Sequence, residues 1–100
     1  MELKDLRDRL DLIDDQITEL FKQRMETVKL VAEYKRTNNT PILAAGREQE
    51  ILDRVSAIAG EDLQEYAKKL FTTLMALSRD YQAEYLQAAN SDTSTTNRDT

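Results

Sequence analysis

The sequence predicts an all-α fold of three helices, of which the first and third are long and the second is short. Glycine occurs twice and proline once in 100 residues, while Leu, Ala, Glu, Gln, Lys and Arg dominate, and these residue types favour helix. Apolar residues also recur in alternating steps of three and four, as the buried face of a helix requires. No run of residues has the alternation typical of a strand.

The first predicted helix runs from Leu3 to about Arg36. At about 1.5 Å per residue its length is on the order of 50 Å, which is too long for a monomer of this size to cover. The core is also thin, because hydrophobic residues make up 40% of the chain and aromatic residues 6%. We therefore expect a second chain beside this helix. The predicted apolar row consists of Leu3, Leu6, Leu10, Ile13, Ile17, Leu20, Val28, Val31 and Tyr34.

The turn-forming residues 37–41 end this helix, because Pro41 disfavours helix at the residue before it. We expect a loop over 42–46, a short helix over 47–59, and a stop at Gly60. Asp62 followed by Glu65 predicts the start of a third helix that ends near Asn90. The predicted inward residues are Ile51, Leu52, Val55 and Ile58, then Leu63, Tyr66, Ala67, Leu70, Leu74, Leu77, Tyr81 and Tyr85, with a neighbouring stripe at Phe71 and Met75.

The last ten residues, 91–100, are polar and contain no apolar side chain. Such a segment cannot anchor itself to a core. We therefore expect one helical domain over residues 1–90, followed by a disordered polar tail or linker stub over 91–100.

The composition excludes several kinds of chemistry. The chain has no cysteine and no histidine, so thiolates, imidazole acid–base catalysis and the usual zinc and haem ligands are excluded, and we expect no metal. A formal net charge of −5 argues against nucleic-acid binding. No apolar run has the length of a signal peptide or a membrane span, so we expect no membrane contact and a cytoplasmic location.

A cation interrupts the apolar row of the first helix at Arg24, one heptad after Ile17. The step from Arg24 to Lys35 makes about three turns plus 20°, so both cations lie on nearly one face, about 16 Å apart along the axis. Val28 and Val31 lie between them. The spacing indicates a pocket for a small anion. Alternatively, Arg24 extends to solvent or sets helix register, and Lys35 is an ordinary cation near a helix C-terminus.

Polar residues also break the stripe of the third helix. Phe71 and Met75 continue at helical spacing into Ser78 and Gln82, whose side chains can form hydrogen bonds to a ligand. The alternative is that the stripe simply reaches the surface there.

Two charged residues, Arg47 and Glu48, open the second helix. A carboxylate complements the positive end of a helix and can also accept a hydrogen bond from a ligand hydroxyl. A glutamate at this position is common without any such role. Arg7 is by itself an ordinary surface cation.

Taken together, these residues closely resemble the all-helical chorismate mutases over residues 3 to about 88. The resemblance implies an intertwined homodimeric helical bundle of three-helix protomers. Each of its two sites would rearrange chorismate to prephenate on the route to phenylalanine and tyrosine, without a cofactor. The residues that carry the resemblance are the segment 6–14 (LRDRLDLID), Arg24, Lys35, Pro41, Arg47, Glu48, Ser78 and Gln82.

By this resemblance, Arg24 of one chain and Arg7 of its partner hold the two carboxylates of chorismate, with Arg47 and Ser78 in support. Arg7 precedes Arg24 by roughly 25 Å along the same helix, beyond the reach of a side chain. It can join the site only from an antiparallel second copy.

The resemblance also implies that Lys35 and Gln82 donate hydrogen bonds to the ether oxygen as the C–O bond breaks, and that Glu48 holds the ring hydroxyl. Where enteric members of the family have an aspartate in the loop before the second helix, this chain has Ala44. A second contact to the substrate hydroxyl is therefore expected to be missing.

Two other functions fit parts of the sequence. The isochorismate-pyruvate lyases resemble the mutases and use similar cations. A noncatalytic helical dimerisation module explains the apolar row but gives no reason for Arg24 together with Ser78 and Gln82. The domain is also of a kind that is often fused to other enzymes of aromatic biosynthesis.

Overall fold

The computed structural model describes the backbone of residues 2–99 and the side chains of residues 2–89. Over this range the chain forms three helices, α1 (Leu3–Thr37), α2 (Ala45–Ala59) and α3 (Gln64–Asp99), and no strand. The predicted all-α class and the order long, short, long are confirmed. Among the described residues, no helix is both long enough and apolar enough to cross a membrane.

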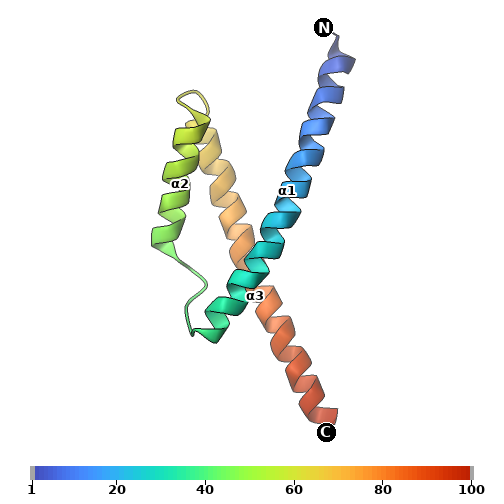
Figure 1. Cartoon of the computed structure of the whole chain (residues 1–100), viewed down its shortest axis with the longest axis vertical. Helices are drawn as coiled ribbons and strands as arrows, with labels where there is room; N and C mark the ends of the chain where they lie inside the picture. The colour runs from blue at the N-terminus through green and yellow to red at the C-terminus, as the bar shows by residue number, and fades with distance from the viewer. Residues whose placement is uncertain (1, 100) are drawn as a thin grey trace.

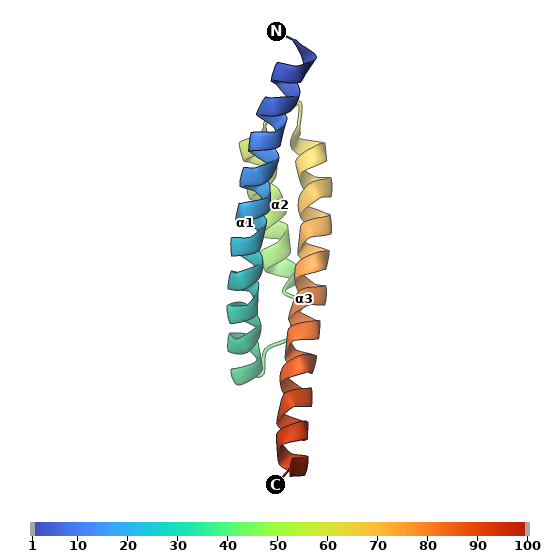
Figure 2. The same cartoon turned by 90° about the vertical axis from the view of Figure 1, so that its right-hand side faces the viewer.

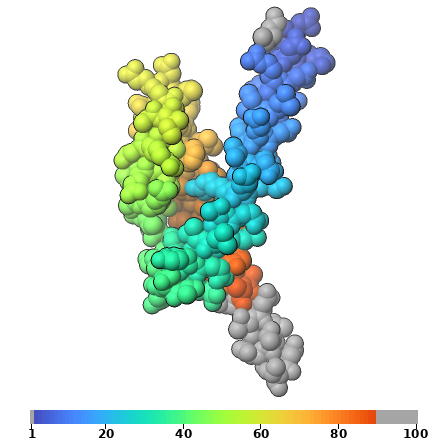
Figure 3. Space-filling model, in the orientation of Figure 1, coloured from blue at the N-terminus to red at the C-terminus, as the bar shows by residue number. Residues whose placement is uncertain are grey.

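The helices form a flat, elongated molecule of 66 × 32 × 15 Å. α1 and α3 cross at an angle, and α2 lies beside the first half of α3 (Figures 1 and 2). α3 packs against both of the other helices. The N-terminal half of α1 extends away from the packed helices and forms a separate arm in Figure 3.

The ends of the helices follow local sequence. Asn38 caps the C-terminal end of α1, where its side chain donates a hydrogen bond of 2.8 Å to the carbonyl of Tyr34, and Asn39 then adopts a φ of 56°. α2 begins two residues before the predicted position and ends at Gly60, whose φ of 86° suits glycine. The end predicted for α3 near Asn90 is wrong, because its helical backbone continues to Asp99. A run of polar residues without glycine or proline does not by itself stop a helix.

The core within one chain is small. It consists of Ile51 and Val55 from α2 and Met75 from α3, with Leu52, Ala67 and Phe71 packed against it. On α1, Val28 and Ala32 are also buried. Because α3 contacts both of the other helices, it holds the packed part of the molecule together.

Many predicted inward residues are exposed within the single chain. Ile58 is 78% exposed, because it lies in the last turn of α2, where none of the described side chains covers it. The apolar row of α1 is exposed over residues 3–20, because the N-terminal half of the helix leaves the packed region. The exposed members of the predicted rows are Leu3, Leu6, Leu10, Ile13, Ile17, Leu20, Val31 and Tyr34 on α1, Leu63 in the turn before α3, and Tyr66, Leu70 and Leu77 on α3.

Candidate active site

A cavity of about 270 Å³ lies where the three helices meet. Six of the seven predicted site residues line it, although they come from three helices. Arg7 does not, because it lies near the exposed N-terminus of α1. The lining residues are Arg24, Thr27, Val28, Val31 and Lys35 of α1, Ile42 and Ala44 of the loop, Arg47, Glu48 and Ile51 of α2, and Met75, Ser78, Arg79 and Gln82 of α3.

Arg24 is fixed against α3 at this cavity. Its guanidinium donates a hydrogen bond to the hydroxyl of Ser78, which in turn donates one of 2.8 Å to the carbonyl of Leu74. Partial burial lowers the pKa of Arg24, and the nearby charge of Arg47 lowers it further. A guanidinium nevertheless stays charged in proteins. Among the described side chains no carboxylate forms an ion pair with Arg24, so its charge is available to an anion.

Lys35 lies at the other end of the cavity, in the last turn of α1. Its ammonium group donates a hydrogen bond of 2.5 Å to the carbonyl of Ile42, and the backbone N–H of Thr40 donates one of 2.8 Å to the carbonyl of Lys35. These two bonds fold the loop back over the end of α1. An ammonium group has three donors, so Lys35 keeps donors for a ligand.

Gln82 is 6% exposed, and its Oε1 atom is buried without a hydrogen-bond partner among the described residues. An unsatisfied buried polar atom costs about 1–3 kcal/mol. Native proteins tolerate such a group mainly where it serves a function. The Oε1 atom can only accept a hydrogen bond, so a donor group of a ligand would satisfy it, whereas the NH2 group of the same amide can donate to a ligand oxygen.

Glu48 forms an ion pair with Arg79 across the cavity wall, from α2 to α3. Sequence reasoning missed Arg79, because it is next to Ser78 in a helix and lies off the apolar stripe. A charged residue beside a predicted site residue was the only available signal. Arg47 instead pairs with Glu50 at 3.4 Å on the exposed side of α2.

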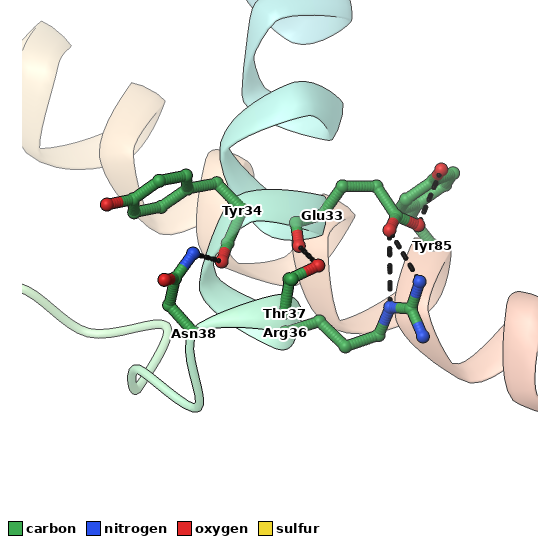
Figure 4. A network of polar contacts seen from close by, with 6 residues as sticks. All are labelled: Glu33, Tyr34, Arg36, Thr37, Asn38 and Tyr85. Atoms are coloured by element: carbon green, nitrogen blue, oxygen red, sulfur yellow. Dashed lines mark hydrogen bonds and ion pairs between the residues drawn. The ribbon is translucent and has the colours of Figure 1, made fainter.

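A network of polar contacts near the C-terminal end of α1 joins that helix to α3 (Figure 4). Tyr85 donates a hydrogen bond of 3.0 Å to the carboxylate of Glu33, which also accepts bonds of 3.2 and 2.7 Å from Arg36. The bonds from Arg36 and then Tyr85 lower the pKa of Glu33, and the bond to Glu33 raises the pKa of Tyr85. The network thus links the C-terminal part of α1 to α3.

The arrangement suits a small anion that also carries a hydrogen-bond donor. Four cations and one carboxylate line the cavity, and valine and isoleucine side chains form part of its wall. Such a site can bind and orient an anionic ligand and can donate hydrogen bonds to an oxygen atom on which charge develops.

Comparison with known proteins agrees with this geometry. The chorismate mutase of Methanocaldococcus jannaschii is 31% identical over 88 residues, which cover 86% of this chain and 89% of that protein. A bifunctional chorismate mutase/prephenate dehydratase of Aquifex aeolicus is 39% identical over 54 residues, or 54% of this chain, but the match spans only 15% of that protein. No solved structure matches the chain significantly. The family model for chorismate mutase type II matches residues 6–83, and the chain therefore belongs to that family.

Proposed function

We propose that the protein is an isomerase that converts chorismate to prephenate by an intramolecular [3,3] rearrangement. The observation that carries the proposal is the meeting of Arg24, Lys35 and Gln82 at one cavity in a chain of this family. The rearrangement needs no nucleophile, which suits a chain without cysteine or histidine. A place in phenylalanine and tyrosine biosynthesis and a cytoplasmic location remain predictions from the sequence.

Substrate binding accounts for the first part of the mechanism. Chorismate must fold into a compact conformer in which the breaking C–O bond and the forming C–C bond are aligned. Arg24, fixed by Ser78, binds one carboxylate through paired N–H donors, and Arg47 adds positive charge at the cavity. Because binding already restricts the substrate to this conformer, a large part of the entropic contribution to the activation barrier is removed before the reaction begins.

Charge stabilisation accounts for the second part. As the C–O bond breaks, negative charge grows on the ether oxygen. Lys35 and the amide of Gln82 donate hydrogen bonds to that oxygen, and these bonds are stronger in the transition state than in the bound substrate. Glu48 accepts a hydrogen bond from the ring hydroxyl and orients the ring.

A second copy of the chain completes the site. The exposed apolar row of α1 borders a second cavity of about 530 Å³ between α1 and α3, lined by Ile17, Leu20, Phe21 and mostly apolar residues of α3. A helix of an antiparallel partner covers this surface and brings its Arg7 toward Arg24, which also lines the second cavity. The homodimer supplies the second carboxylate ligand in this way.

Separate incubations with chorismate and with isochorismate test the proposal. We expect prephenate from chorismate, detected by NMR or by the loss of chorismate absorbance. Salicylate from isochorismate without prephenate from chorismate would identify a lyase instead. If chorismate is untouched and Arg24→Leu raises the melting temperature, the chain is a noncatalytic dimerisation module.

A further inference from the structure

The Glu48–Arg79 ion pair differs from the other ion pairs of the described side chains. The other six join residues three or four positions apart on one helix, whereas Glu48 and Arg79 join α2 to α3. Both residues also line the cavity, with side-chain exposures of 25% and 34%. An ion pair within one exposed helix contributes little, but a pair between two helices fixes the position of both groups.

Glu48 needs such support because its own surroundings hold it weakly. It lies in the first turn of α2, and the N-cap residue Ala44 that precedes this helix forms no side-chain cap. Ala44 and Gly46 also provide no second side chain that could hold the carboxylate or share its ligand. Arg79 projects from the middle of α3, where the helix is packed, and so offers a rigid partner.

The pairing also resolves an electrostatic conflict. An unpaired carboxylate at Glu48 would repel the carboxylates of an anionic substrate in the same cavity. Arg79 offsets that charge, and its hydrogen bond occupies the Oε2 atom of Glu48. The Oε1 atom of Glu48 remains available to accept a hydrogen bond from a hydroxyl.

We infer that Arg79 is a positioning residue that acts through Glu48 to select substrates carrying the ring hydroxyl. The inference rests on the proposed function. Arg79 orients the carboxylate so that one oxygen faces the hydroxyl, and it allows that carboxylate to lie in a cavity that binds a dianion. A substrate without the hydroxyl makes no use of this arrangement.

The test compares the wild type, Arg79→Gln, Glu48→Gln and the double variant on two substrates, chorismate and its analogue lacking the ring hydroxyl. We expect Arg79→Gln to lower kcat/KM for chorismate about tenfold more than for the analogue, since one hydrogen bond to a charged group is lost. The double variant is expected to equal Glu48→Gln alone, because the two residues act as one unit. Arg79→Lys, which keeps the charge, is expected to recover part of the loss.

Arg54→Gln is the matched control, because Arg54 is exposed on α2 and does not line the cavity. It should change neither kcat/KM value. Equal losses on both substrates for Arg79→Gln, or additive losses in the double variant, would overturn the inference. If the wild type does not convert chorismate, the proposed function itself fails. A fall in melting temperature for Arg79→Gln with an unchanged ratio of the two substrates would assign Arg79 a structural role only.

Discussion

The hydroxyl of Tyr85 on α3 donates a hydrogen bond of 3.0 Å to the carboxylate of Glu33 on α1. This bond joins the two helices. We expect Tyr85→Phe to lower the melting temperature by roughly 2–5 °C at constant protein concentration, as the loss of one partly exposed bond in a small domain should. Tyr66→Phe is the matched control, since Tyr66 is exposed and forms no such bond. Equal melting temperatures for wild type and Tyr85→Phe would show that the bond contributes nothing.

The same network predicts a dependence of stability on pH. The folded-state pKa of Glu33 is lowered, so its contribution is present above the ordinary pKa of a glutamate and is lost as pH falls through the lowered value. We expect Glu33→Gln to be less stable than wild type at pH near 7, and the difference in melting temperature to shrink as the pH is lowered toward about 3. A difference that stays constant over this range would contradict the prediction.

Lys35 and Ser78 line the same cavity but should matter differently. Lys35→Ala removes a donor to the reacting oxygen and is expected to lower kcat by about 10²–10³-fold. Ser78→Ala removes only a residue that fixes Arg24 and should have a much smaller effect. Steady-state kinetics on chorismate, with circular dichroism to verify folding, measure both. Similar losses in kcat for the two variants would refute these roles.

Because the amide of Gln82 does not titrate, we expect that the rate of the wild type does not require a protonated carboxyl group at this position. In Gln82→Glu, the side chain donates a hydrogen bond only while it is protonated. We expect kcat/KM of this variant to fall about tenfold per pH unit above the pKa of the new carboxyl group, whereas the wild type lacks this fall. Rates measured from about pH 4.5 to 8 test this. A variant that keeps the wild-type profile would show that position 82 does not contact the reacting oxygen.

Mixing two inactive variants tests the shared site. After refolding together, Arg7→Ala and Arg24→Ala chains form heterodimers in half of the pairs, each with one intact site, so about one quarter of wild-type activity should return. A mixture of Arg24→Ala and Lys35→Ala should recover none, because both residues belong to the same protomer's part of the site. Failure of the first mixture to recover activity would place Arg7 outside its partner's site.

The sequence predicted much of the site because departures from helical periodicity mark it. Arg24 occupies a position where the apolar row requires a hydrophobic residue, and Ser78 and Gln82 end an apolar stripe. These breaks converge on one cavity because their helices cross there. Arg79 could not be found in this way, because its importance depends on a contact between residues 48 and 79 that no local pattern encodes.

The fold was predictable to a similar extent. Helix order, the end of α1 in the turn-forming segment 37–41 and the end of α2 before Gly60 follow from local chemistry. The apolar rows could be read from the sequence, but periodicity identifies only which face of a helix is apolar and not which part of the same or another chain packs against it. Ile58 shows the limit, since it has the spacing of a core residue and lies in a helix end that none of the described side chains covers.

The exposed N-terminal arm of α1 has a consequence for the activity of the protein in dilute solution. The leucines of this arm are in the same helix as Arg7 and Arg24, so under the proposed pairing one surface supports both folding and turnover. Specific activity should then depend on the protein concentration, and a substitution that weakens pairing should raise the concentration needed for half-maximal activity. Natural selection on the rate and on the stability of such an enzyme therefore acts on the same residues.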